Sequence, residues 1–318
     1  MSRPPLGIRI LSALRSEPDW STMSAERLAA FAAAENRKRS ARLTRLVSGF
    51  PDRGATIAWQ RLDLPGRAVP VRVHRPAGHD APLPLVLHIH GGGFVGTATQ
   101  SDWINSHLAA HLPAVVVSVE HRLIAPSVPL AAAVDDGWDV LRLVLEHAGQ
   151  WRIDPSRATV FGESAGGAVA ALCALRARDA GLRLRAQVLV NPAVDLTATA
   201  LDYASVREHP DSPTLTVATV RFFRELAVPE GTDPRPLSPL YADSLRDLAP
   251  ALVVVPTLDP LADQGRRYAE RLRAAGTPAE LTEHPGAVHA FVSMPGVVPQ
   301  AKAARDEITG FLRARLAA

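Results

Sequence analysis

The sequence is poor in cysteine, since its 318 residues include only Cys173. A single cysteine excludes an intrachain disulfide and a cluster of thiolate metal ligands. Cys173 lies in the alanine-rich apolar stretch 168–175, which is typical of a helix. We therefore interpret it as a small buried residue rather than as a nucleophile.

Long apolar runs are also missing. No segment has 18 consecutive apolar residues, so the sequence predicts no membrane-spanning helix and no membrane insertion. The apolar stretch near the N-terminus is short and is interrupted by Arg9, which does not fit a secretory signal. We expect a soluble, cytoplasmic protein.

Lysine is nearly absent, and arginine carries almost all of the positive charge. The isoelectric point is about 9.5, yet the formal net charge is only +3, and the arginines are spread along the chain. One local cluster comprises Arg37, Lys38, Arg39, Arg42 and Arg45, in a segment with a helical pattern. This arrangement favours a solvated helix face over a nucleic-acid site. We predict no nucleic-acid partner.

The sequence does contain a regular alternation of short apolar runs and longer helical segments. The continuous runs predict buried parallel strands at 83–90, 114–119, 158–161, 186–190 and 251–255, with a last strand at 279–283. The helical patterns lie at 128–146, 165–178 and 261–275. Before them, runs at 55–64 and 68–74 flank Pro65-Gly66 and predict an antiparallel hairpin. This order predicts an α/β fold with an open, mostly parallel sheet.

Two segments break the alternation. Residues 24–47 have the pattern of one or two amphipathic helices, and residues 197–239 are proline-rich and too long for a simple crossover. An insertion at the carboxyl end of a strand lies above the ligand crevice of an open sheet, so we expect a lid; the alternative is a meandering surface loop. The predicted organisation is an N-terminal helical cap segment at 1–50, a core at 51–196 and 240–318, and a cap insertion at 197–239.

A GxSxG pentapeptide, Gly162-Glu163-Ser164-Ala165-Gly166, follows directly behind the apolar run that ends at Phe161. A serine between such glycines, leaving a strand and entering a helix, is how an α/β-hydrolase exposes its nucleophile. A glycine-rich loop without catalytic function is the alternative when the pentapeptide is taken alone. Ser164 also requires a base, an acid and an oxyanion loop.

The acid and the base should follow Ser164 in that order. Asp259 comes at the carboxyl end of an apolar run, and we favour it over Asp263, which falls where the next helix begins and can instead brace the loop. His289 lies in a loop behind the last strand, and we favour it over His284, at the strand end beside Pro285.

Donors for an oxyanion are predicted in the loop after the run at 83–90. There Gly91, Gly92 and Gly93 follow His90, and glycine backbone lets N–H groups approach a substrate closely. We assign the Gly92 and Gly93 amides to the oxyanion hole, with the amide of Ala165 completing it. The alternative, a metal pair of His88 and His90 on one strand face, has no third ligand nearby. We predict no metal site.

Together these motifs resemble the hormone-sensitive-lipase-like (bacterial family IV) esterases of the α/β-hydrolase superfamily. The resemblance covers residues 83–318 and also includes Asn191-Pro192-Ala193-Val194-Asp195-Leu196-Thr197, Ser238-Pro239-Leu240, Asp259-Pro260-Leu261-Ala262-Asp263 and His289-Ala290-Phe291. It implies an α/β-hydrolase fold with a mostly parallel eight-stranded sheet flanked by helices, and a helical cap. It also implies that His90 shapes the oxyanion loop, that no cofactor is needed, that the esters have small or medium acyl groups, and that a homodimer is common.

The chain departs from the family pattern at three places. Glu163 replaces the usual aspartate before the nucleophile, and Ala290 replaces the glycine after the histidine. The stretch 120–127 is similar to a family signature but has His121 in place of tyrosine and Ser127 in place of glutamate, with Ile124 as an extra residue. These changes lie around the predicted site and leave its reactive positions intact.

The sequence therefore predicts a serine carboxylic-ester hydrolase that acts on a small-molecule ester through an acyl-enzyme. The same machinery would serve an amidase, a lactonase, a carbamate hydrolase or an acyltransferase. A non-catalytic small-molecule receptor on the same scaffold is the alternative of another class, but such receptors are expected to lose the histidine, which is present here as His289.

Overall fold

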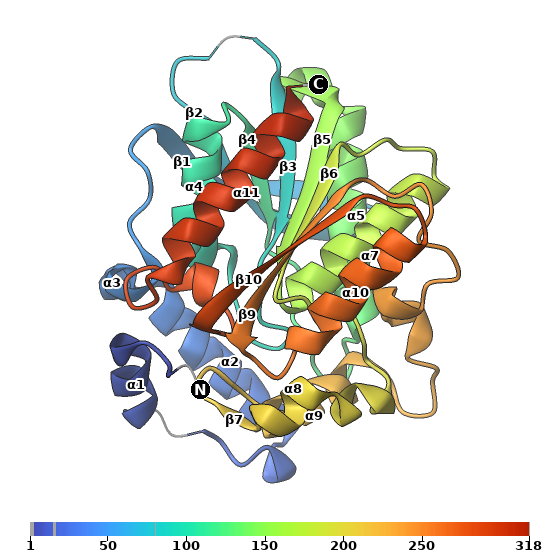
Figure 1. Cartoon of the computed structure of the whole chain (residues 1–318). Coiled ribbons are helices and arrows are strands. Elements are labelled where there is room, and N and C mark those ends of the chain that lie inside the picture. The colour runs from blue at the N-terminus through green and yellow to red at the C-terminus, as the bar shows by residue number, and fades with distance from the viewer. Residues whose placement is uncertain (1–2, 15–16, 80, 318) are drawn as a thin grey trace.

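Eight strands form one twisted sheet at the centre of the computed structural model, which describes residues 3–14, 17–79 and 81–317 (Figure 1). Residues 1–2 and 15–16 of the predicted N-terminal segment lie outside the described residues. The strand order is β1-β2-β4-β3-β5-β6-β9-β10, and only the pairs β1–β2 and β2–β4 are antiparallel. The predicted α/β-hydrolase fold is confirmed. The sheet strands are β1 (Ala55–Leu64), β2 (Arg67–Pro76), β3 (Leu83–Ile89), β4 (Val115–Val119), β5 (Ile153–Glu163), β6 (Ala186–Val190), β9 (Ala251–Leu258) and β10 (Ala279–Val288).

Helices cover both faces of the sheet. Because successive side chains of a strand point to opposite faces, each central strand contributes to two apolar layers. Val86, Val116 and Val254 pack with the helices α4 and α11, whereas the adjacent Leu87 and Val117 pack with α5, α7 and α10. The bounds are α4 (Asp102–His111), α5 (Leu130–Glu146), α6 (Ala148–Trp151), α7 (Ala165–Asp179), α10 (Ala262–Ala274) and α11 (Gln300–Leu316). Cys173 is buried in α7, as predicted.

Two strands are longer than the sequence predicts. β5 begins at Ile153, five residues before the apolar run, and β10 continues to Val288 with a register shift between His284 and Val288. Residues 286–288, predicted as a loop, therefore belong to the strand, and the prediction of a strand end beside Pro285 is wrong. Each extension contains at least one polar residue and a proline, so a search for apolar runs does not detect it. As a result, His289 follows directly on a strand that the sheet holds in place.

The N-terminal segment and the insertion after β6 lie together at the carboxyl end of the sheet, at the bottom of the view in Figure 1. Trp20 joins them, since its ring stacks on Phe222 with centroids 4.9 Å apart and meets the edges of Phe31 and Phe94. The helices and strands here are α1 (Leu6–Ala13), α2 (Ala25–Ser40), α3 (Arg45–Ser48), α8 (Ala204–Glu208), β7 (Asp211–Ser212), β8 (Leu215–Thr216) and α9 (Val217–Ala227).

Short 3-10 helices complete the described secondary structure. They span Trp20–Thr22, Arg42–Thr44, Ala98–Ser101, Ala198–Asp202, Arg235–Leu237, Pro239–Tyr241 and Phe291–Ser293. Among the residues that the structure describes, no helix combines the length and apolar character needed to cross a membrane.

The Trp20 contact predicts how the N-terminal segment is held. Trp20→Ala should lower the free energy of local opening of α2 by about 3 kcal/mol, because a large ring is lost from an apolar cluster. Hydrogen exchange read by mass spectrometry measures this opening. Trp59→Ala, at a residue 46% exposed on β1, is the matched control. Unchanged exchange of α2 in the Trp20 variant would contradict the assignment.

Candidate active site

The tightest backbone turn in the site is at Ser164, between β5 and α7. Ser164 has φ 56° and ψ −121°, a conformation that L residues rarely adopt. A Cβ at Gly162 would lie 2.0 Å from the carbonyl oxygen of Gly166, and a Cβ at Gly166 would lie 2.3 Å from that of Ile89. Only glycine fits at both positions, so the GxSxG pattern arises from the close approach of backbone to backbone.

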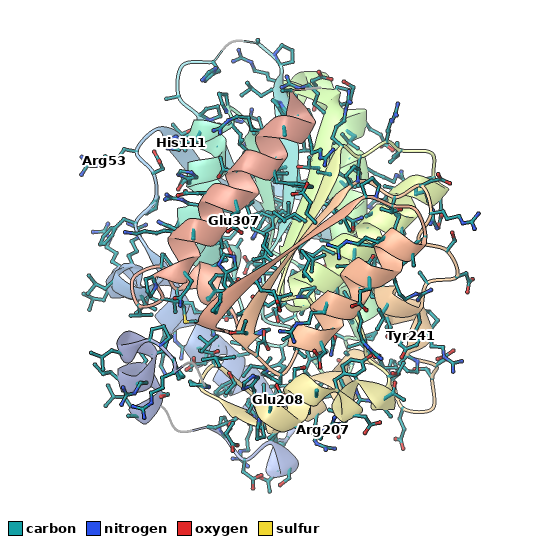
Figure 2. All side chains as sticks on the ribbon, in the orientation of Figure 1. Arg53, His111, Arg207, Glu208, Tyr241 and Glu307 are labelled. Carbon is teal, nitrogen blue, oxygen red and sulfur yellow. The ribbon has the colours of Figure 1, made fainter. Side chains whose placement is uncertain are left out.

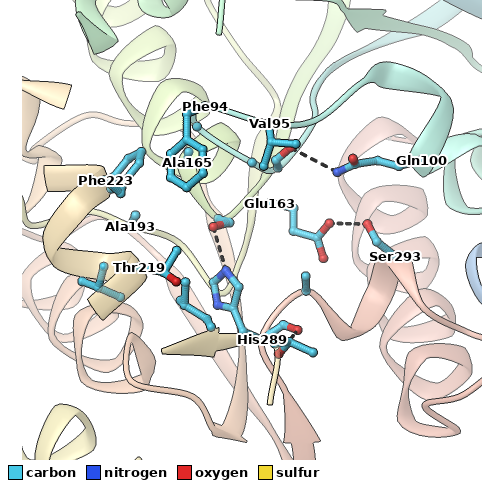
Figure 3. A pocket seen from close by; sticks show the side chains of 18 of the residues that line it. Phe94, Val95, Gln100, Glu163, Ala165, Ala193, Thr219, Phe223, His289 and Ser293 are labelled. Carbon is cyan, nitrogen blue, oxygen red and sulfur yellow. Dashed lines mark hydrogen bonds between the residues drawn. The ribbon is translucent and has the colours of Figure 1, made fainter. Parts of the chain in front are cut away.

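The structure brings Ser164, His289 and Asp259 into one hydrogen-bonded chain. The Nε2 atom of His289 is 2.8 Å from the Ser164 Oγ, an interaction marked by a dashed line at His289 in Figure 3. The Nδ1 atom of His289 is 2.7 Å from Asp259 Oδ2. Asp259 is fully buried at the end of β9, and its Oδ1 accepts a hydrogen bond from the Leu261 amide. Asp259 therefore has a fixed orientation toward the imidazole.

The two rival residues have other partners. Asp263 accepts a hydrogen bond from the Ser205 amide at 2.9 Å and pairs with Arg266 at 2.8 Å, so it ties α8 to α10. His284 lies within β10, packed against Phe291 with ring centroids 5.1 Å apart and 3.2 Å from Glu307. Neither residue joins the chain of hydrogen bonds at Ser164.

The glycine loop after β3 lies beside Ser164. Gly92 has φ 91°, and a Cβ there would lie 1.7 Å from the Val95 carbonyl oxygen, so this position requires glycine. A Cβ at Gly93 would lie 2.2 Å from the Phe223 ring and would displace it. The Gly93 carbonyl accepts a hydrogen bond from the Ile124 amide at 2.8 Å. Residues 91–93 line the same cavity as Ser164, Ala165 and His289. Ala165 is the first residue of α7, where backbone N–H groups have no partner within the helix.

The ring of His90 contacts the glycine loop. It is buried, stacks on His121 with centroids 4.2 Å apart, and has Nδ1 3.0 Å from the Gly91 carbonyl oxygen. Burial, together with the neighbouring His121, holds the pKa of His90 well below its ordinary value, so the ring is neutral. His121, which departs from the family pattern, thus packs directly against the loop.

The altered stretch 120–127 is anchored to α5 by ion pairs. The buried Asp136 accepts hydrogen bonds from the Arg122 amide and guanidinium, at 2.9 Å each, and from Arg67. Burial alone would raise the pKa of the Asp136 carboxyl, but these hydrogen bonds outweigh it and hold the pKa below its usual value. These ion pairs hold the backbone of the stretch 120–127 in place, including Ile124. The Ile124 amide in turn holds the Gly93 carbonyl.

His88 and His90 have different hydrogen-bond partners. His88 lies inside the sheet with Nδ1 2.8 Å from Ser118 Oγ, and burial lowers its pKa to about 3. His90 bonds to the glycine loop instead. The two imidazoles therefore take part in packing and hydrogen bonding at separate places.

Glu163 connects the nucleophile turn to the segment that follows His289. It is buried, and its Oε2 accepts a hydrogen bond from the Ser293 hydroxyl (Figure 3). Burial raises the pKa of the Glu163 carboxyl, and the Ser293 hydrogen bond and the nearby His289 offset this only in part. Ala290, the residue after His289, has φ 59°, which explains why glycine is usual there.

A cavity of about 370 Å³ opens in front of Ser164. Figure 3 shows Phe94 and Phe223 on one, apolar side and Gln100, Glu163 and Ser293 on the other. The apolar lining residues are Trp20, Phe31, Phe94, Val220, Phe223 and Leu261, and the lining also includes the charged residues Glu35, Lys38, Arg39, Asp195 and Arg224. The sequence did not identify these lining residues or Ser293, since they come from segments whose packing partners no local pattern reveals. For α9 the amphipathic pattern around Val220 and Phe223 was the available signal.

The sheet order, the turn at Ser164 and the cavity at the carboxyl ends of the strands define an α/β-hydrolase. A family model described as "alpha/beta hydrolase fold" matches residues 86–293. The carboxylesterase NlhH of Mycobacterium tuberculosis (strain ATCC 25618 / H37Rv) is 40% identical over 242 residues, which cover 73% of this chain and 74% of the relative. The esterase LipI of the same strain is 39% identical over 252 residues, covering 77% and 78%.

A comparison with solved structures supports the same family. An ester-hydrolase from the metagenome of Lake Arreo, in complex with a bipyridine phosphonate derivative, superposes with a TM-score of 0.87 at 30% identity, over 99% of this chain and 100% of the other. The chain belongs to the hormone-sensitive-lipase-like esterases and is a carboxylesterase-type hydrolase.

The burial of Glu163 predicts a pH-dependent stability. A carboxyl group whose pKa is higher in the folded state than in the unfolded state contributes less to stability as the pH rises. This loss begins above the pKa of the unfolded state, near 4.5, and continues until the pH has passed the pKa of the folded state. The Glu163→Gln variant has no carboxyl group at this position, so its stability does not fall with pH in this way. Its free energy of unfolding relative to wild type should therefore increase with pH, as measured by urea unfolding from pH 4 to pH 8. The exposed Glu230→Gln variant controls for loss of a carboxylate, and a Glu163→Gln difference that falls with pH would refute the interpretation.

Proposed function

We propose that the chain hydrolyses carboxylic esters through an acyl-enzyme formed on Ser164. The observation that carries this proposal is the pair of hydrogen bonds made by His289, which lies 2.8 Å from Ser164 Oγ through Nε2 and 2.7 Å from Asp259 Oδ2 through Nδ1. His289 removes the hydroxyl proton as Ser164 attacks the ester carbonyl, and later gives it to the leaving alcohol. Asp259 orients the imidazole and stabilises its cation. Water then deacylates the serine by the same route.

The oxyanion that forms in each step is stabilised by the amides of Gly92, Gly93 and Ala165. The close fit of Gly93 against Phe223 and its hydrogen bond with Ile124 support a rigid loop. Donors held rigidly in this way need no reorganisation when charge develops, and each is worth on the order of 3 kcal/mol in the transition state. His90, Gly91 and Glu163 support the site without touching the reacting atoms.

Residues 1–50 and 197–239 form a cap over the core made by residues 51–196 and 240–318. Two contacts support this division. Trp20 and Phe222 stack across the two cap parts, and the Thr214 hydroxyl donates to the His289 carbonyl oxygen at 2.9 Å. The second contact links the insertion directly to the segment that holds the base.

The cavity of about 370 Å³ suits small to medium acyl groups. Its apolar side receives the acyl chain, and aromatic rings there limit its length. The cytoplasmic location and the homodimer remain predictions from the sequence and from the family resemblance.

Ser164→Ala should lower kcat/KM for p-nitrophenyl butyrate by about 10⁴-fold or more, since the nucleophile is lost. His289→Ala should have an effect of similar size. Ser244→Ala, at an exposed loop serine, is the control and should keep wild-type turnover. Wild-type turnover in the Ser164 variant would refute the acyl-enzyme.

The same assay distinguishes substrate classes when run with esters of graded acyl length beside lactone and amide substrates. We expect the highest kcat/KM among acyl chains of about two to six carbons, given the cavity volume. A preference for the lactone or the amide would overturn the ester assignment while leaving Ser164 as the nucleophile.

A further inference from the structure

Three side chains with metal-ligating atoms gather away from the cavity. His107 and His111 lie one turn apart on α4, with ring centroids 4.1 Å apart, and Asp52 comes from the segment between α3 and β1. Figure 2 labels His111 beside Arg53, the neighbour of Asp52 in the chain. None of the three residues lines the active-site cavity.

The distances fit a common metal position. Oδ2 of Asp52 is 2.9 Å from Nε2 of His111 and 3.8 Å from Nδ1 of His107, and all three ligand atoms lie within 4.8 Å of one another. Zinc bonds of 2.0–2.2 Å in a tetrahedral site place ligand atoms about 3.3 Å apart. The measured separations therefore lie close to those that three ligands of one ion require.

The backbone already orients the carboxylate. Oδ1 of Asp52 accepts a hydrogen bond from the Gly54 amide at 2.8 Å, and the Asp52 amide donates to Ser106 Oγ on α4 at 2.7 Å. Oδ2 is therefore the oxygen directed at the two rings. Fixed outer contacts of this kind hold a metal ligand in its binding geometry.

Charges of both signs surround the three side chains. Arg305 and Asp306 of α11 act on His107 from one side and pair with each other at 2.9 Å, and the Arg313 guanidinium donates a hydrogen bond to the His111 carbonyl oxygen at 3.1 Å. Asp52 contributes the negative charge next to the ion. The simpler alternative is that Asp52 and His111 form a hydrogen bond with no metal involved, and the experiment must separate the two.

We propose that Asp52, His107 and His111 bind a divalent transition-metal ion of the zinc class. Two imidazoles and one carboxylate are ligands that zinc prefers, and water completes the coordination. The ion would join the segment that follows the N-terminal arm to α4 and so to the core of the sheet. This site is structural, goes beyond ester hydrolysis, and does not depend on the proposed catalytic roles.

The test uses the full, tag-free chain after treatment with a chelator. Calorimetric titration with zinc chloride should show one ion bound per chain. At about 100 times the dissociation constant, zinc should raise the Tm by about 4 °C. Magnesium chloride should give no shift, because magnesium prefers an all-oxygen shell. Absence of zinc binding to the wild-type chain would overturn the proposal.

Single substitutions test whether the ion is bound by Asp52, His107 and His111. His111→Ala, at a side chain 51% exposed, and Asp52→Asn should each lose the stoichiometric binding and the Tm shift while keeping the circular dichroism spectrum and ester turnover of the wild type. His147→Ala, at an exposed histidine on another element, is the matched control and should keep both. Zinc binding of wild-type stoichiometry and affinity in the His111 variant would overturn the proposal and place the ion elsewhere, for example at His289.

Discussion

The close packing of backbone around Ser164 is the constraint on which the site depends. The left-handed conformation at Ser164 is stable because Gly162 and Gly166 let three backbone segments touch, including the carbonyl of Ile89 at the end of β3. β3 and β5 are neighbours in the sheet, so the same contact places Ser164 beside the glycine loop. A single added methyl group at either glycine would push these elements apart.

The remaining parts of the site reach Ser164 from the carboxyl ends of other parallel strands. Asp259 follows β9 and His289 follows β10, which pair with each other in the sheet. Open α/β sheets place ligands at this edge, because all the parallel strands end there. Glu163 and Ser293 then link the nucleophile turn to the histidine segment by a second, direct contact. The geometry of the site is thus held by the sheet and by buried hydrogen bonds.

Much of this arrangement could be predicted from the sequence, because it follows from local patterns. Apolar runs identified the strands, and the required order of serine, acid and base selected Ser164, Asp259 and His289. The pattern could not give the full length of β10, whose last part contains Pro285 and Gly286. Contacts between segments far apart in the sequence could not be predicted either. No pattern around Glu163 predicts its hydrogen bond with Ser293, and Asp52 contacts His111 only in the folded chain.

The most direct test of the account is mass spectrometry of the chain after reaction with a fluorophosphonate. Such reagents modify an activated serine and leave a stable adduct. The account predicts one phosphonyl group per chain, located on Ser164, with loss of ester hydrolysis in proportion to labelling. Full labelling of Ser164 with turnover retained, or inactivation by an adduct on another residue, would contradict it.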